Sequence, residues 1–240
     1  MNRVVLLATA RTGSNLLVDT LNKHPALYFH GELFHRARVN GFRAYKAVEA
    51  LGVDPTELRD RDHLRFLDLV FEYSVGVGRV AAGFKLFLNH SNVVLKHVIE
   101  NDAYRLIVLE RQNFLASYSS MLIGQATGIW HSRDGEVETT PPITFDPAAF
   151  ENYRRSIESS YATLRQRVVG RPNVFDIEYR QLSNPPVVSR LVEFLGAEGG
   201  ASLSPELRKQ NSSDIVGRFD NPAEVLAYLE REGLLSWKEE

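Results

Sequence analysis

The polar turn that follows the first apolar run of the chain has the residue types of an anion-binding loop. The apolar run, Val4–Thr9, predicts a buried strand, and the turn Ala10–Asn15 leads into leucines at helical spacing. Between a strand and a helix, backbone N–H groups and the N-terminus of the helix point at a bound anion. Arg11 adds a fixed positive charge on a planar fork that suits phosphate or sulfate. With the hydroxyls of Thr12 and Ser14, the turn predicts a site for a single tetrahedral anion.

This turn departs from the phosphate loop of ATP-binding proteins, whose pattern is G-x-x-x-x-G-K-[ST]. Only the second glycine is kept, as Gly13, while Ala8 replaces the first glycine, Ser14 the lysine and Asn15 the hydroxyl that binds magnesium. Without that hydroxyl, a magnesium ion bridging two phosphates loses its usual protein ligand. We therefore expect a phosphate site that needs no metal, rather than the site of an ATP hydrolase. The alternative is a turn of an ordinary α/β protein that binds nothing.

A second pair of residues could bind another phosphate. Arg111 follows the apolar run RLIVLE at residues 105–110, at the end of a predicted strand, where open α/β sheets bind ligands. Ser119 lies eight residues further on, about two turns inside the next predicted helix. Its hydroxyl then lies on a helix face that can point toward the end of the strand. Ser117 and Ser120 are alternatives for the serine that contacts the phosphate. The competing interpretation is an arginine that caps the sheet edge and a serine that the helix merely tolerates.

Predicted strands and helices alternate from one end of the chain to the other. Short apolar runs bounded by turn residues predict strands over residues 4–9, 26–30, 79–87, 105–110 and 173–177. Helical spacing and start and stop signals predict helices over residues 16–23, in two or three segments within 39–75, and over 91–101, 113–126, 146–169, 185–195 and 222–232. This alternation predicts an α/β fold, a single domain over residues 1–240 with a parallel sheet flanked by helices. Residues 128–145 have no clear period, and a connection of that length predicts a lid or a disordered segment.

Composition excludes several classes of protein and site. Lys and Arg number 28 and Asp and Glu 30, so the net charge of −2 argues against a general nucleic-acid binder. With no cysteine, a disulfide framework, a thiol nucleophile and a cysteine zinc site are impossible. The N-terminal apolar run is too short for a signal peptide, and the longest uncharged stretch, residues 112–132, is too polar for a membrane span. We expect a cytoplasmic protein and leave a homo-oligomer open.

Four segments of the chain stand in a recognisable order. They are RTGSNLL at 11–17, Arg111 with Ser119, FDIEYRQL at 175–182 with FLG at 194–196, and RKQN at 208–211. Through them the chain resembles the sulfotransferases that use 3′-phosphoadenosine 5′-phosphosulfate (PAPS), most nearly the bacterial carbohydrate types such as nodulation-factor and trehalose sulfotransferases. The resemblance implies the P-loop-like fold of the nucleotide kinases, and it spans nearly the whole chain.

The resemblance also implies which residues hold the nucleotide. For the 5′-phosphosulfate these are Arg11, Thr12, Gly13, Ser14 and Asn15. For the 3′-phosphate they are Arg111, Ser119 and Lys209, of which Lys209 belongs to a late basic segment that closes over the nucleotide. Tyr179 is implied as an adenine contact.

Sulfuryl transfer to an alcohol removes the hydroxyl proton as the new S–O bond forms, and a carboxylate within hydrogen-bond reach can accept it. Cytosolic sulfotransferases use a histidine two residues after a strand lysine, but here Lys85 matches the lysine and Phe87 stands at the histidine. Bacterial and tyrosylprotein members use a glutamate after the first helix, and the segment HPALYFHGELF at 24–34 matches that pattern with Glu32. We therefore expect Glu32, in a loop after a strand, to be the base, with Lys85 and Arg11 stabilising the transferred group.

His30 and His35 are the rival bases, although such histidines more often pack or hydrogen-bond locally. Their spacing is not that of a zinc protease, and no third ligand is evident, so no metal site is expected. The predicted function is transfer of a sulfuryl group from PAPS to a hydroxyl of a carbohydrate or other small metabolite, which releases 3′-phosphoadenosine 5′-phosphate (PAP). The alternatives are an ATP-dependent metabolite kinase and a nucleotide-binding protein without catalysis.

Overall fold

The computed structural model describes residues 1–41, 43, 52, 54–130, 141–199, 203 and 212–240. The chain divides into two compact units. The sheet unit comprises Met1–Glu110 and Arg165–Pro205, and the helical unit comprises Arg111–Leu164 and Glu206–Glu240. The expectation of a single domain over 1–240 stays a prediction.

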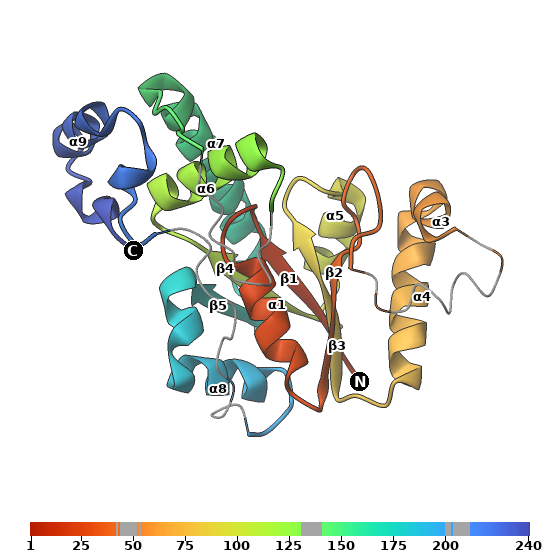
Figure 1. Ribbon diagram of the computed structural model, residues 1–240. Helices are drawn as coiled ribbons and strands as arrows, with labels where there is room; N and C mark the ends of the chain where they lie inside the picture. Colours follow the sequence, from red (N-terminus) through yellow and green to blue (C-terminus); the bar gives the residue numbers. More distant parts are fainter. Residues whose placement is uncertain (42, 44–51, 53, 131–140, 200–202, 204–211) are drawn as a thin grey trace. The chain divides into compact units, whose positions relative to one another are not determined.

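The sheet unit is built on parallel strands. In the described part of the chain the sheet has five strands in the order β2-β3-β1-β4-β5 (Figure 1). Their bounds are β1 Asn2–Ala8, β2 Leu27–Glu32, β3 Ala81–Phe87, β4 Tyr104–Glu110 and β5 Val174–Glu178. Residues 4–8 of the central strand are fully buried, as expected for a parallel strand covered on both faces. The α/β fold with a parallel sheet flanked by helices is therefore confirmed.

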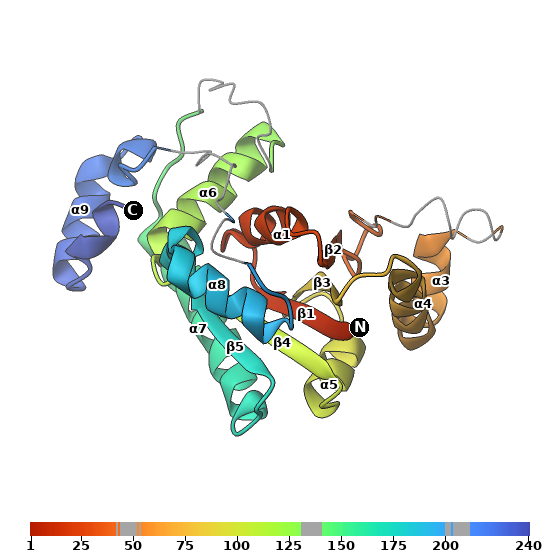
Figure 2. The same cartoon turned by 90° about the horizontal axis from the view of Figure 1, so that it is seen from below.

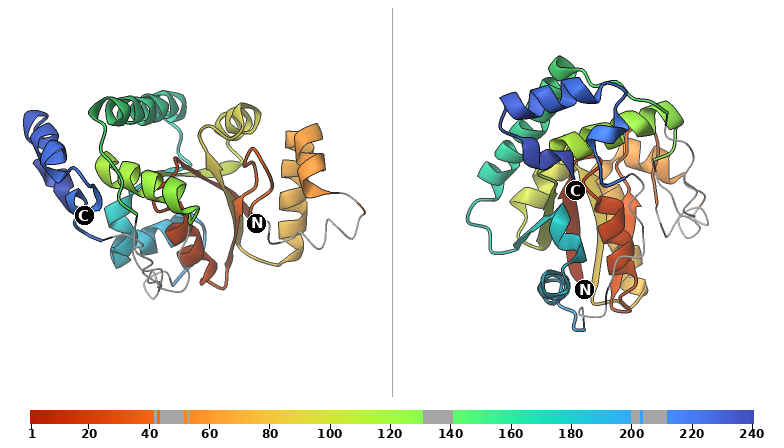
Figure 3. Two further views of the ribbon diagram at one scale, coloured as in Figure 1. Left: turned by 45° about the horizontal axis from the view of Figure 1, so that its top comes forward. Right: turned by 60° about the vertical axis from the view of Figure 1, so that its left-hand side comes forward.

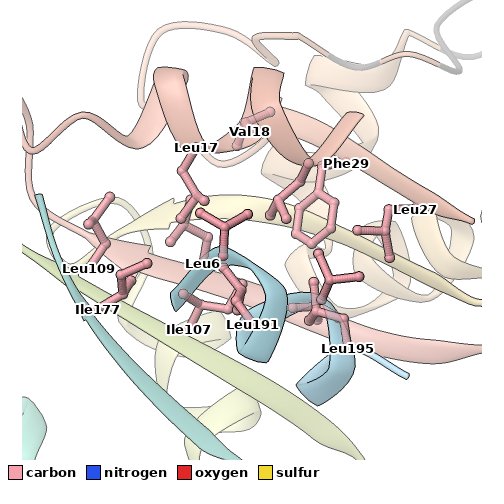
Figure 4. Close-up of a cluster of buried hydrophobic side chains, with 14 of the residues drawn as sticks. Leu6, Leu17, Val18, Leu27, Phe29, Ile107, Leu109, Ile177, Leu191 and Leu195 are labelled. Carbon is pink, nitrogen blue, oxygen red and sulfur yellow. The ribbon is translucent and has the colours of Figure 1, made fainter. Parts of the chain in front are cut away.

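One face of the sheet packs against α1, Ser14–Asn22, and α8, Pro185–Phe194. Figure 4 shows Leu17 of α1 and Leu191 of α8 in one cluster with Leu6 and Ile107 from the strands. Lys85 pairs in register with Leu6 on the neighbouring strand. Since residues paired in this way point to the same face of a sheet, Lys85 lies on the face that α1 and α8 cover.

Helices α4, His63–Gly76, and α5, Asn92–Glu100, belong to the opposite face. There Phe71 of α4 makes edge contacts with Phe84 of β3 and Tyr104 of β4, with ring centroids 6.1 and 5.8 Å apart. The short helix α3, Pro55–Arg61, precedes α4 (Figure 2).

Most of these helices begin at a side chain that accepts backbone N–H groups. Asp54, Asp62 and Ser91 cap α3, α4 and α5 in this way. Helix α1 differs, because Gly13 stands at its N-cap and has no side chain to offer. Its first N–H groups are therefore served by the loop itself or by a ligand.

The helical unit has its own apolar core. It contains α6, Phe114–Thr127, most of α7, Pro147–Val168, and α9, Pro222–Arg231. Figure 3 shows α9 beside the 3₁₀ helices η3, Val216–Arg218, and η4, Leu235–Lys238. The core includes Tyr118, Phe145, Phe150, Phe219 and Tyr228.

The observed bounds match the predicted elements to within a few residues, with two differences. Glu32 is the last residue of β2 and not part of a loop, because the strand continues beyond His30 to pair with Lys85. Short 3₁₀ helices such as η1, Tyr179–Ser183, were not predicted, since turns of this length leave no periodic pattern. Residues 131–140 of the predicted lid, and residues 42, 44–51 and 53 of the segment 39–75, lie outside the described residues.

Candidate active site

The loop between β1 and α1 has the backbone of an anion cradle. Arg11 has φ of 65° and Gly13 φ of 83°, both in the left-handed region that L-residues with side chains rarely adopt. The Thr12 hydroxyl is buried and donates to the carbonyl of Thr9 over 2.9 Å, which fixes the turn. Residues in the left-handed region of a loop can direct successive N–H groups into one concavity, which is an arrangement that receives anions. A left-handed arginine at such a point is the kind of strain that functional loops retain.

Gly13 is required by its neighbour as well as by its own φ. A Cβ atom placed on Gly13 would lie 2.5 Å from Cδ2 and 2.7 Å from Cε2 of Tyr179. Tyr179 is the first residue of η1, directly after β5, and its ring lies against the loop at Gly13. The structure thus brings Tyr179, the predicted adenine contact, against the predicted 5′-phosphosulfate loop.

Glu32 and Lys85 meet across neighbouring strands. Glu32 ends β2 and pairs in register with Lys85 of β3, after an irregularity in the ladder that follows Phe29. Lys85 Nζ lies 2.8 Å from Glu32 Oε1 and also donates to Asn15 Oδ1 at the start of α1. The lysine side chain is 2% exposed and the glutamate side chain 15%. One ammonium group therefore joins the predicted base to the predicted anion loop.

Burial sets the electrostatics of this group. Desolvation lowers the pKa of Lys85 below its ordinary value, and the opposing charge of Glu32 partly restores it. Arg11 also acts on Lys85 as a like charge and lowers the pKa further. Lys85 is thus a buried cation whose charged form is stabilised by nearby carboxylates, first Glu32 and then Asp19.

His90 is a residue of this region that the sequence did not indicate. It lies in the turn after β3, where its Nε2 is 3.9 Å from Glu32 Oε2 and its ring packs on Phe87. Burial lowers the pKa of His90 to about 4, so the imidazole is neutral at neutral pH. Its only advance signal was its position just beyond a strand that carries a candidate catalytic lysine.

The two rival bases differ in their surroundings. His30 is fully buried, 3.2 Å from the Ser74 hydroxyl through Nε2 and 3.2 Å from the N–H of Arg43 through Nδ1. Burial lowers its pKa to about 3, and these contacts assign it a packing role. His35 is half-buried, accepts from the N–H of Ala37 and packs edge-on against His90.

Two of the predicted 3′-phosphate residues, Arg111 and Ser119, lie in the helical unit and have protein partners there. Arg111 donates through Nε to Glu240 Oε2 over 2.9 Å, and its Nη2 contacts the same oxygen. The Ser119 hydroxyl is buried, donates to the carbonyl of Ala116 and accepts from Arg218 Nη1 over 2.8 Å. Lys209 lies outside the described residues.

No group of three or more His, Cys, Asp or Glu side chains among the described residues is arranged to hold a metal ion. Among the helices that the structure describes, none combines the length and apolar character needed to cross a membrane.

Comparison with solved structures identifies the fold. A sulfotransferase from Alicyclobacillus acidocaldarius is similar over 98% of this chain and 98% of its own, with 18% identity and a TM-score of 0.52. The sulfotransferase domain of the olefin synthase of Synechococcus is similar over 87% of this chain and 78% of its own, with 17% identity and a TM-score of 0.48. A mouse sulfotransferase, solved in complex with PAP, is similar over 92% of this chain and 64% of its own, with 13% identity and a TM-score of 0.45.

Neither a protein-family model nor a curated protein sequence matches the chain. At such low identity a likeness in structure speaks for the arrangement of the elements, and only the first of the three similarities is close enough to carry that argument. The chain shares the fold of the Alicyclobacillus sulfotransferase over nearly its whole length.

Proposed function

We propose that this protein is a sulfotransferase that moves a sulfuryl group from PAPS to a hydroxyl of a carbohydrate or other small metabolite. The observation that carries the proposal is the position of Lys85, whose ammonium group contacts both Glu32 and Asn15. The proposed base Glu32, the cation Lys85 and the proposed anion loop therefore lie together at the carboxyl ends of the strands, where ligands of open α/β sheets bind. The fold shared with a sulfotransferase supports the same conclusion.

The loop residues Arg11, Thr12, Gly13, Ser14 and Asn15 hold the 5′-phosphosulfate in this proposal. The uncapped start of α1 and the left-handed turn supply N–H groups, and Arg11 supplies the full positive charge. Because Asn15 stands where nucleoside triphosphatases carry the magnesium-binding hydroxyl, the chemistry relies on these groups and not on a metal.

Glu32 is the general base of the proposed reaction. As the acceptor oxygen bonds to sulfur, its proton passes to the Glu32 carboxylate. The bond between sulfur and the 5′-phosphate oxygen breaks, and PAP leaves with the negative charge. Preorganised cations at the site of that developing charge are the main source of catalysis in such transfers.

Lys85 serves two partners in turn. Without a ligand, Glu32 balances the charge of this buried ammonium group, which would otherwise be costly. When the phosphosulfate occupies the loop beside Asn15, the same ammonium can turn toward the oxygen that leaves sulfur. The exchange frees the Glu32 carboxylate for the acceptor proton at the moment that the donor is in place.

The remaining donor contacts are Arg111, Ser119 and Lys209 for the 3′-phosphate and Tyr179 for the adenine. The support for Tyr179 is its packing on Gly13. A cytoplasmic location stays a prediction.

Incubation of the purified protein with radiolabelled PAPS and a panel of mono- and disaccharides, aliphatic alcohols and phenols tests the proposal. We expect PAP release that depends on one acceptor class, persists in EDTA and is lost in Glu32→Gln. Phosphate transfer from ATP that requires Mg²⁺ would instead establish the metabolite kinase. Tight PAP binding without turnover of any acceptor would establish a nucleotide-binding protein without catalysis.

A further inference from the structure

The fork of Arg111 holds a carboxylate from the same unit of the chain. Its Nε and Nη2 both reach Oε2 of Glu240. The side chain of Arg111 is 9% exposed and that of Glu240 is 4% exposed, so the pair is removed from solvent. A desolvated arginine and carboxylate with charge-assisted hydrogen bonds are a much stronger contact than an ion pair on the surface.

The backbone around Glu240 holds this carboxylate in place. The N–H of Glu240 donates to the carbonyl of Ser213 over 3.2 Å, and the N–H of Ile215 donates to the carbonyl of Lys238 over 2.9 Å. The side-chain amide of Asn113, two residues beyond Arg111, donates to the carbonyl of Trp237 over 3.1 Å. The segment 237–240 is thus tied on both sides, and the fold itself delivers the Glu240 side chain to Arg111.

An arginine fork offers the same donors to a carboxylate and to a phosphate. If Arg111 binds the 3′-phosphate of the donor, as proposed above, its Nε and Nη2 cannot serve that phosphate and Glu240 together. We propose that Glu240 is an intramolecular competitor, whose carboxylate occupies the position of the 3′-phosphate and withdraws when the nucleotide binds. This inference rests on the proposed function and adds a regulation of the same site.

If Glu240 competes with the 3′-phosphate, the apparent affinity for PAP is the intrinsic affinity multiplied by the fraction of molecules whose fork is open. Removal of the Glu240 carboxylate then strengthens PAP binding. In a positioning role, in which Glu240 orients Arg111, the same change weakens nucleotide binding, and in a purely structural pair it changes stability alone.

The experiment measures PAP and 5′-AMP binding by calorimetry in the wild type and in Glu240→Gln, a variant of the same shape without the charge. The matched control is Glu239→Gln, which removes one charge from the preceding, exposed residue. Glu240→Asp keeps the charge but shortens the reach by one methylene, so it opens the fork even if Glu240→Gln folds poorly. Thermal unfolding of each variant verifies that it is folded.

If the fork is open in about one molecule in ten, Glu240→Gln binds PAP about tenfold more tightly and Glu240→Asp gains in the same direction. Affinity for 5′-AMP, which lacks the 3′-phosphate, stays unchanged, and Glu239→Gln behaves as the wild type. Unchanged or weaker PAP binding in Glu240→Gln overturns the proposal, as does an equal gain in Glu239→Gln or for 5′-AMP. If no variant binds PAP at all, the proposed function itself fails, whereas a failure confined to the ratio between variants leaves it standing.

Discussion

The ammonium group of Lys85 lies 2.8 Å from the carboxylate of Glu32, and the two side chains come from adjacent strands that are about fifty residues apart in sequence. Parallel pairing of β2 with β3 creates this contact, since it sets Glu32 opposite Lys85 at the carboxyl end of the sheet. The contact with Asn15 then extends it to the first turn of α1. The proposed chemistry is therefore a property of the strand order as much as of the individual residues.

Glu32→Gln keeps the shape of the side chain but cannot accept a proton. General-base catalysis contributes roughly 10²–10⁴-fold, so we expect kcat for sulfuryl transfer to fall by about that factor. PAP affinity should stay near that of the wild type, because the nucleotide contacts are left intact. Steady-state kinetics with PAPS, together with PAP calorimetry, measures both quantities.

Histidine variants are the controls for the base. His35→Ala and His90→Asn alter two imidazoles near the proposed base. His90 lies near the Glu32 carboxylate, and His35 packs against His90. Each should lose far less kcat than Glu32→Gln. A folded histidine variant that loses more would transfer the role of base from the carboxylate to that imidazole.

Lys85→Met removes the charge and keeps much of the apolar stem. The Glu32 carboxylate, largely buried, then loses its ion-pair partner, and breaking a buried pair in this way costs about 3 kcal/mol of unfolding free energy. Urea denaturation measures the loss. The double variant Lys85→Met with Glu32→Gln should recover part of it, because the uncompensated charge is gone, and a strictly additive double variant would contradict the coupling.

The anion loop and the sheet could be predicted because their signals are local. A short apolar run, a turn with Arg11 and Gly13, and helical spacing after it identify a strand, a loop and a helix without knowledge of the rest of the chain. The same holds for the pairing of Asp54 or Ser91 with a helix start. These features depend on neighbours within a few residues, where propensity and periodicity carry the information.

The contacts that complete the site depend on distant residues. The sequence could propose Glu32 and Lys85 separately, from a resemblance, but not their mutual distance, because the order of strands is not written in either segment. His90 and Glu240 carry no motif, and each is brought to its partner by tertiary packing. Such residues become visible only when the fold is known.

Gly13→Ala should weaken both the fold and nucleotide binding. An L-residue with a side chain in the left-handed region costs roughly 1–2 kcal/mol, and here the new methyl group also collides with the ring of Tyr179. Gly170→Ala is the matched control, since Gly170 has φ of 76° and open space around it. Thermal unfolding should show a larger loss for Gly13→Ala, and calorimetry should show weaker PAP binding in that variant alone. Equal losses in the two variants would mean that the Tyr179 contact is unimportant.

Arg111→Ala should discriminate between nucleotides. Loss of a charge-assisted hydrogen bond to a phosphate costs about 1.5–3 kcal/mol of binding, and only a nucleotide with a 3′-phosphate makes that bond. PAP affinity should therefore fall toward that of 5′-AMP, while 5′-AMP affinity changes little. If the wild type binds 5′-AMP as tightly as PAP, Arg111 and Ser119 do not form the 3′-phosphate site.

The buried His30 predicts how stability depends on pH. The Ser74 hydroxyl donates to the carbonyl of Val70, so it accepts from Nε2 of His30, while Nδ1 accepts from the N–H of Arg43. Protonation of Nδ1 would sacrifice that acceptor, and burial lowers the pKa of His30 to about 3 against 6.5 in the unfolded chain. Between these values the unfolded state binds the extra proton, so the contribution is complete above about pH 6.5 and is lost progressively as the pH falls. At pH 5 the loss is about 2 kcal/mol. Urea denaturation at pH 7.5 and pH 5 should therefore show a smaller difference in His30→Gln than in the wild type, and an unchanged difference would show that His30 is not the group responsible.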